Sequence, residues 1–435
     1  MKKILLINPK RVGRGQSSVN YMSATPLALP LLASMVPSDF EVSIIDENNQ
    51  HIDYDQNVDL VGISVMLHVG PQAISIAQEF KKRNVPVVMG GFFPSLWPEK
   101  AAPYVDSIVR GEGEHLWLHL LDDLKNDRPL KPIYKQDGYI DLKETPIVKR
   151  EFMQGADCYH VETTRGCPYA CDYCSVSRFY GKTYRHRPIK DVVKQLEQLT
   201  DKPVFFVDDN IAADTKYAKE LFRKIAHLNI VWSGQFTLFS AKDTELLDLA
   251  YKSGCKFLFA GIETLNKQNL EDVNKSWAQP EKYPDYIKMV HDAGIALYGS
   301  FMFGFEHDDA SVFEKTLHFA EETKIELALF SAIFPMEGAE FYAQLKRENR
   351  VFETDMAKFN GQHATFYPKL MTPEELDEGL LWIWQNFYSK KSIQKRLAHC
   401  FSKVSLSNIS ADGKYSMEEM MVYLNTAFRV AVEDF

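Results

Sequence analysis

Three cysteines share one short stretch of this chain, Cys167-Pro168-Tyr169-Ala170-Cys171-Asp172-Tyr173-Cys174. An apolar run at Tyr159–Thr163 precedes it, and a helical pattern at Ile189–Leu199 follows it, so the stretch is predicted to be a loop between a strand and a helix. The remaining cysteines are scattered, at Cys158, Cys255 and Cys400. Clustered thiols of this spacing indicate metal ligation in a reducing compartment rather than a disulfide framework.

Three thiolate ligands leave one metal position open. Structural zinc sites prefer four protein ligands, whereas an iron–sulfur cube held by three cysteines keeps one iron free to bind a small molecule. The alternatives are three packed thiols or a zinc knuckle completed by Cys158 or His160. The spacing and the strand–loop setting favour the iron–sulfur cluster.

After the loop, short apolar runs alternate with helical patterns. Strands are predicted at Tyr159–Thr163, Val204–Val207, Val231–Thr237, Phe257–Gly261, Ala296–Phe303 and Leu327–Phe334. Helices are predicted at Ile189–Leu199, Tyr217–Leu228, Thr244–Ser253, Tyr286–Ala293 and Ser311–Glu322. Six βα units of this kind predict an open, partial barrel.

The segment before the loop alternates in the same way. Strands are predicted at Lys3–Asn8, Glu41–Ile45, Leu60–Met66 and Val85–Met89, and helices at Leu27–Met35 and Ala73–Arg83. The pattern predicts a parallel, doubly wound sheet. Ser64, Gly90 and Gly91 fall near the ends of predicted strands, where open α/β sheets bind ligands, so this half is expected to hold a nucleotide-like cofactor.

The predicted fold class is α/β. A doubly wound, Rossmann-like domain is expected at 1–140, a partial (β/α)6 barrel at 141–345 and a helical C-terminal region at 346–435. A proline-containing linker is expected at about 126–155. The C-terminal helices are predicted at Glu374–Tyr388, Ile393–Phe401 and Ser416–Val430, and the aromatic residues of the first are expected to pack a core.

Composition excludes several classes of protein. The 435 residues are 45% hydrophobic and 25% charged, which is typical of globular domains and excludes wholesale disorder, collagen-like structure and a disulfide-rich scaffold. A net charge of −9 gives no strong signal of nucleic-acid binding. No apolar run approaches the roughly 18 residues of a transmembrane segment, and the first residues lack a cleavable signal, so a cytoplasmic location is expected.

Polar residues gather at the predicted carboxyl ends of the barrel strands. They are Asp208-Asp209, Gln235, Gly261-Ile262-Glu263-Thr264 and the segment that ends at Gly304-Phe305-Glu306. Active sites of βα barrels lie on this face. Simpler interpretations exist, because an aspartate pair often caps the next helix and Gly-x-Glu often forms a turn.

The run Thr163-Thr164-Arg165-Gly166, followed by the cysteine loop, resembles the radical S-adenosylmethionine (SAM) enzymes. The resemblance implies that Cys167, Cys171 and Cys174 hold a 4Fe-4S cluster, whose fourth iron is chelated by SAM. One-electron reduction then cleaves SAM to a 5'-deoxyadenosyl radical. By the same resemblance, SAM is positioned by Tyr173, Asp209, Gln235, Glu263 and Gly304.

The first half resembles the cobalamin-binding domain of B12-dependent radical enzymes. The resemblance rests on Asn8-Pro9, Gly62-Ile63-Ser64, Gly90-Gly91-x-x-Pro94-Ser95 and Arg110-Gly111-Glu112-Gly113-Glu114, and covers nearly the whole chain. It implies bound cobalamin near Ser64, Gly90 and Gly91, although a glycine pair also suits a tight turn. The Asp-x-His-x-x-Gly motif is absent, which implies a cobalt without a protein histidine ligand.

This resemblance implies a cobalamin-dependent methyltransferase that acts on an unactivated carbon of a small-molecule or lipid-like substrate. It needs an external one-electron reductant such as flavodoxin or ferredoxin. The alternatives are radical oxidation, cyclisation or carbon coupling without methyl transfer, and a zinc-stabilised binding module that is not an enzyme. Methylthio transfer is disfavoured because no cysteine precedes Cys158. No catalytic residue is assigned.

Overall fold

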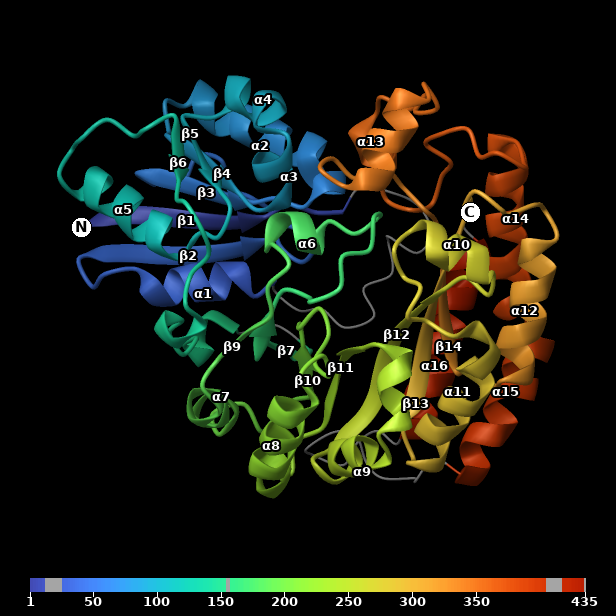
Figure 1. Cartoon of the computed structure of the whole chain (residues 1–435). Helices are drawn as coiled ribbons and strands as arrows, with labels where there is room; N and C mark the ends of the chain where they lie inside the picture. Colours follow the sequence, from blue (N-terminus) through green and yellow to red (C-terminus); the bar gives the residue numbers. More distant parts are fainter. Residues whose placement is uncertain (12–25, 154–156, 404–416, 434–435) are drawn as a thin grey trace.

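The computed structural model describes residues 1–11, 26–153, 157–403 and 417–433. It contains two six-stranded parallel sheets and a helical C-terminal region (Figure 1). The α/β fold class predicted from the sequence is confirmed.

The first sheet has the strand order β2-β1-β3-β4-β5-β6. Its strands are β1 (Lys2–Asn8), β2 (Phe40–Asp46), β3 (Leu60–Ser64), β4 (Val87–Gly90), β5 (Ser107–Arg110) and β6 (Ile133–Lys135). Its helices are α1 (Ala28–Met35), α2 (Gly70–Lys82), α3 (Phe92–Leu96), α4 (Pro98–Ala101) and α5 (Glu114–Lys125).

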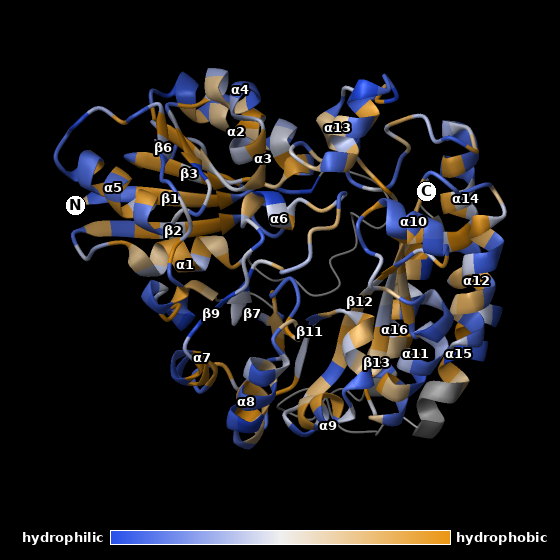
Figure 2. Ribbon diagram, viewed as in Figure 1, coloured by the Kyte–Doolittle hydropathy of each residue, from blue (hydrophilic) through white to orange (hydrophobic). Residues whose placement is uncertain are grey.

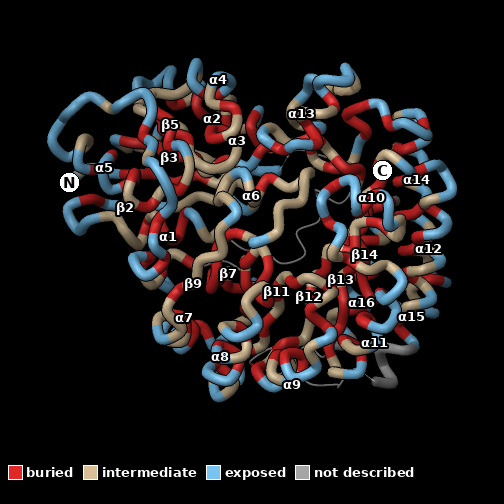
Figure 3. The backbone as a smooth tube through the Cα atoms, in the orientation of Figure 1, coloured by how far each residue is buried: buried red, intermediate tan, exposed pale blue. Residues whose placement is uncertain are grey.

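Both faces of the first sheet are covered. Leu5 and Ile7 of β1 pack into a cluster that includes residues of α2, whereas Ile4 and Leu6 pack with residues of α1 and α5. An unbroken apolar strand is what a doubly covered parallel sheet requires. Figures 2 and 3 show the central strands β1 and β3 as mostly hydrophobic and buried.

The linker predicted at 126–155 is wrong in part, because β6 lies within it. Ile133–Lys135 pairs with β5 as an edge strand, and only its central Tyr134 is buried. Three residues with a single buried side chain give no periodic signal. β5, with four residues, was also not predicted.

The second sheet has the order β14-β13-β12-β11-β10-β7 and is open, with β14 and β7 at its edges. Its strands are β7 (Tyr159–Val161), β10 (Val204–Phe206), β11 (Trp232–Phe236), β12 (Cys255–Glu263), β13 (Ala296–Phe303) and β14 (Leu327–Ala332). Its helices are α6 (Val176–Phe179), α7 (Ile189–Leu196), α8 (Thr215–Ile225), α9 (Thr244–Lys252), α10 (Lys267–Asp272), α11 (Tyr283–Asp292) and α12 (Val312–Glu322). The six predicted strands of a partial barrel are confirmed.

Side chains of this second sheet alternate between two environments. On β12, Leu258, Ala260 and Ile262 are buried, whereas Phe257 and Phe259 on the opposite face are half-buried. On β13, the buried Phe301 packs against Phe319 of α12. The buried side chains of the sheet therefore face the helices that cover its outside. The inner face is therefore the less covered one.

The helices of the C-terminal region are α13 (Glu340–Arg347), α14 (Pro373–Phe387), α15 (Lys390–Lys403) and α16 (Met417–Glu433). Helix α14 packs on β14, and α15 and α16 pack on α14, whereas α13 lies apart from them (Figure 1). Trp384 and Tyr388 are buried and donate hydrogen bonds to the carbonyl oxygens of Phe330 (2.9 Å) and Ala328 (2.7 Å). The predicted packing role of these aromatic residues is confirmed. α13 was not predicted, and Ser416 lies outside the described residues.

Among the helices that the structure describes, none has the length and apolar character needed to span a membrane.

Candidate functional site

The cysteine loop lies between the two strands of a short antiparallel pair, β8 (Thr164–Arg165) and β9 (Arg185–His186). Gly166 makes the turn into the loop with φ +86°, and a Cβ there would lie 2.4 Å from the carbonyl oxygen of Thr183. Only glycine fits this approach. The loop then leads into α6.

The three thiols of the loop are half-buried and free. Burial raises the pKa of Cys167 to about 11 and of Cys174 to about 12, and it also raises the pKa of Cys171. Buried thiols of this kind ionise when a metal binds them. Among the described residues, no three His, Cys, Asp or Glu side chains surround a single ion position, and this holds for the three thiols as well. An iron–sulfur cube binds its cysteine ligands on separate irons, so three sulfur donors on one loop fit such a cluster.

Tyr173 and Glu263 meet beside the loop. The Tyr173 hydroxyl donates to Glu263 Oε1 at 3.2 Å, and Lys275 Nζ lies 2.9 Å from the same oxygen. Burial raises the pKa of Tyr173 well above its usual value, so the phenol stays a neutral donor. Glu263 has φ +68° at a register shift that ends the β12–β13 pairing, and this turns its backbone out of the strand. Lys275 was not predicted, because nothing in its sequence neighbourhood marks it.

Asp208 and Asp209 have different surroundings. Asp208 is fully buried and accepts the backbone N–H groups of Thr163 (2.7 Å) and Thr164 (3.1 Å), which ties the end of β10 to the entry of the loop. Asp209 accepts the N–H of Gly166 at 3.2 Å. Burial raises the pKa of Asp208 to about 7 and of Asp209 to about 6. Asp209 thus touches the residue before the first cysteine of the loop.

Gln235 and Gly304 lie at the ends of β11 and β13. The Gln235 side chain is half-buried. Gly304 has φ +95°, and its N–H donates to Asp308 Oδ2 at 3.1 Å. The other oxygen of Asp308 accepts Asn269 Nδ2 at 2.7 Å. The amide of Gly304 is therefore bound by a carboxylate of this chain.

Ser64, Gly90 and Gly91 gather at the carboxyl edge of the first sheet. Ser64 pairs with Gly90 in the β3–β4 register. Gly91 has φ +100°, and a Cβ there would lie 2.8 Å from the carbonyl oxygen of Val65, so this turn requires glycine. His68 follows β3, and burial lowers its pKa to about 4, which keeps the imidazole neutral.

This edge of the first sheet meets the cysteine loop. The ring of Phe92, which begins α3, stacks on Phe179 of α6 with 4.3 Å between centroids, and Tyr180 approaches Phe92 edge-on at 6.2 Å. Figure 1 shows α3 and α6 side by side. The residues that follow β4 and those that follow the cysteines are therefore neighbours.

A buried ionic cluster joins the same two regions. Arg165 pairs with Glu162 (2.8 Å), Glu112 (2.9 Å) and Glu114 (2.8 Å), and Arg185 also pairs with Glu112 (2.8 Å). The sequence motifs contained Arg165 and Glu112 but gave no sign that they contact each other.

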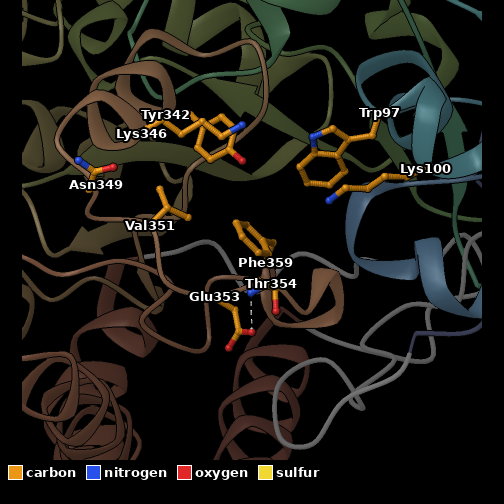
Figure 4. Close-up of a pocket in the computed structure, with 9 residues that line it drawn as sticks. All are labelled: Trp97, Lys100, Tyr342, Lys346, Asn349, Val351, Glu353, Thr354 and Phe359. Carbon is orange, nitrogen blue, oxygen red and sulfur yellow. Dashed lines mark hydrogen bonds between the residues drawn. The ribbon is translucent and has the colours of Figure 1, made fainter.

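A separate cavity of about 390 Å³ lies between α4 and α13 (Figure 4). Aromatic and basic side chains share its wall: Lys100 Nζ lies 4.4 Å from the centre of the Trp97 ring, and Lys346 Nζ lies 4.5 Å from that of Tyr342. It is lined by Trp97, Lys100, Tyr342, Lys346, Asn349, Val351, Glu353, Thr354 and Phe359. None of the site residues predicted from the sequence is among them.

Comparison with protein families gives three matches. Residues 161–320 match the Radical SAM superfamily, residues 19–121 match the B12 binding domain, and residues 339–434 match a domain of unknown function.

The chain is 29% identical over 416 residues to bacteriochlorophyllide d C-12(1)-methyltransferase of Chlorobaculum tepidum, covering 91% of this chain and 89% of the relative. Two similar solved structures share its fold. The methyltransferase TsrM from Kitasatospora setae, with cobalamin and a [4Fe-4S] cluster, has a TM-score of 0.65 at 15% identity, over 93% of this chain and 89% of that one. The radical enzyme OxsB, with aqua-cobalamin and SAM, has a TM-score of 0.67 at 14% identity. The match covers 100% of this chain and 79% of OxsB.

Proposed function

Because this chain is a radical SAM enzyme with an N-terminal B12-binding domain, we propose that it transfers a methyl group to an unactivated carbon of a small molecule. One observation carries the proposal. Phe92, next to the glycine pair of the first sheet, stacks on Phe179, next to the cysteine loop. A methyl carrier at the first site would therefore lie beside a radical source at the second.

Cys167, Cys171 and Cys174 would hold the [4Fe-4S] cluster, and the edge at Ser64, Gly90 and Gly91 would hold cobalamin. When bound, the cluster supplies the electron that cleaves SAM, and the cobalamin supplies the methyl group. The relatives with solved structures bind these groups: TsrM holds cobalamin and a cluster, and OxsB holds aqua-cobalamin and SAM.

The side chains around the loop would position SAM. Tyr173 and Glu263 are already joined by a hydrogen bond, and Phe305 approaches the Tyr173 ring edge-on at 6.4 Å between centroids. Asp209 would fix the turn before the first cysteine through the Gly166 amide. Gln235 and Gly304 complete the proposed set.

One residue of the loop has an aromatic partner outside it. Tyr169 stacks on Trp277 with 4.2 Å between ring centroids. Apolar contacts of this kind would help to keep water away from a reactive radical. The division into domains at 1–140, 141–345 and 346–435 is part of the same proposal.

A lipid-like substrate and a flavodoxin or ferredoxin as reductant remain our proposals for the partners. The leading alternative is radical oxidation, cyclisation or coupling without methyl transfer. The second is a zinc-stabilised binding module.

Anaerobic purification with cobalamin supplied, followed by iron, sulfide, zinc and corrin analysis, tests the proposal. We expect iron, sulfide and corrin together. Addition of SAM and a strong reductant is then expected to yield both S-adenosylhomocysteine and 5'-deoxyadenosine. The first product would come from SAM that methylates cobalamin, and the second from SAM that is cleaved to the radical. Deoxyadenosine alone would favour the first alternative, and zinc without iron would favour the second.

A further inference from the structure

Lys275 is a buried cation beside the cysteine loop that the proposed function does not use. Its side chain is 5% exposed, and it follows α10 in a segment without a recognised motif. Lysine is rarely buried unless its charge is compensated, so the position needs an explanation.

The ammonium of Lys275 is held from two directions. It donates to the carbonyl oxygen of Gly261 at 3.0 Å and lies 2.9 Å from Glu263 Oε1, whose side chain is 12% exposed. Its Nζ also lies 5.4 Å from the centre of the Trp277 ring, which stacks on Tyr169 of the loop. These contacts fix the charge in one place.

The residues before Lys275 attach this segment to the cysteine loop. The N–H of Asp172 donates to the carbonyl oxygen of Val273 at 3.0 Å, and Asn274 Nδ2 donates to the carbonyl oxygen of Ala170 at 3.0 Å. Asn274 adopts φ +58°, a left-handed conformation that asparagine tolerates. The ammonium is thus held at a set position relative to the thiols.

The segment that carries Lys275 contacts the loop on both sides of Cys171. Ala170 and Asp172, the two neighbours of that cysteine, are the residues that bond to Asn274 and Val273. The buried charge is therefore attached directly beside one of the three proposed cluster ligands.

We propose that Lys275 is a positioning residue that holds Glu263 and, through its buried charge, raises the reduction potential of the cluster bound by the loop. The inference rests on the proposed function, since it assumes that the three cysteines hold a cluster. Reduction adds one negative charge to the cluster. A fixed positive charge in a poorly solvated region stabilises the reduced form, and net charge is one of the factors that set cluster potentials.

The test is an EPR-monitored redox titration of the reconstituted protein without SAM. In K275M we expect the equilibrium constant for one-electron reduction to fall about tenfold, which corresponds to a potential about 59 mV lower. K275R, which keeps the charge, is expected to stay closer to the wild type than K275M. K267M is the matched control, because it removes the same charge from a side chain that is 70% exposed, where water screens it.

If Lys275 had only a structural role, the changes in reduction potential would not have opposite signs in K275M and E263Q. E263Q removes the negative partner and is expected to raise the potential, whereas the double variant K275M/E263Q is expected to return toward the wild-type value. If K275M alone fails to take up iron, the double variant, which buries no unpaired charge, is compared with E263Q and is expected to have the lower potential.

Equal potentials for the wild type, K275M and K267M would overturn the inference and leave the proposed function intact. Failure of the wild-type chain to incorporate iron and sulfide would instead overturn the proposed function.

Discussion

The two six-stranded sheets of this molecule differ in how their faces are covered. In the first, β3 is buried on both faces from residue 60 to residue 63, whereas β11 and β12 in the second alternate between buried and half-buried residues. A sheet covered on both faces leaves only its carboxyl edge for a ligand. The partial barrel also leaves an inner face, which suits a reaction that needs room for a substrate. Variants in the two regions are therefore expected to have separable effects.

The largest effect is expected for the cysteine loop. Replacing Cys171 with alanine removes one of three proposed ligands, so cluster content and 5'-deoxyadenosine formation should be lost while corrin binding by the first domain remains. Iron, sulfide and corrin analysis measures this. Cys255→Ala is the control, because that thiol is buried at the amino end of β12, away from the loop. A fully loaded Cys171→Ala protein would contradict the assignment.

The second largest effect is expected at the buried ionic cluster between the two regions, where a substitution should lower the free energy of unfolding. Arg165→Met leaves Glu112, Glu114 and Glu162 buried without their shared partner, and breaking a buried ion pair costs about 3–5 kcal/mol. Urea unfolding measures the free energy of unfolding.

The control for the Arg165 variant is Arg150→Met. The pair of Arg150 with Asp201 is about half exposed, and a loss below about 1 kcal/mol is expected there. Similar losses in the two arginine variants would show that the buried cluster contributes no more than a surface pair.

At the edge of the first sheet, Gly91→Ala is expected to reduce corrin binding and spare the cluster, the reverse of the cysteine variant. The positive φ costs about 1–2 kcal/mol for an L-residue, and the clash with Val65 adds to it. Gly111→Ala separates the two causes, because Gly111 has φ +93° but a Cβ there would meet no atom within 4 Å beyond its chain neighbours. Corrin absorbance and unfolding free energy are the measurements, and equal effects at both glycines would exclude the close approach as the cause.

The smallest effect is expected for the aromatic contact between the regions. Phe92→Leu keeps most of the apolar contact area but removes the stack on Phe179, which is worth about 0.5–1.5 kcal/mol. The midpoint of urea unfolding measures this loss. Phe352→Leu serves as the control, because its ring also has an aromatic neighbour, Tyr367 at 4.9 Å between centroids, but both rings are exposed (38% and 53%), so stability should change less. A larger loss of stability in the Phe352 variant would argue that the contact between Phe92 and Phe179 does not stabilise the packing of the two regions.

Much of the fold followed from local pattern. The six strands of the barrel were predictable because each is a short apolar run between turn residues, and β13 was predicted with its observed bounds, Ala296–Phe303. β5 and β6 were not, since strands of four and three residues are too short to show a period. α11 begins at Tyr283 rather than at Tyr286, because Pro284 occupies its first turn.

The sequence by itself determined the cysteine loop, the glycine turns and the order of the domains, because these depend on residue type and on spacing along the chain. Only the tertiary structure decided which charges meet. Glu112 and Arg165 lie in different domains, and Lys275 reaches Glu263 across a turn and a helix. These ion pairs form only when distant parts of the chain come together and exclude water. The residues around each charge in the sequence do not indicate which partner it will contact.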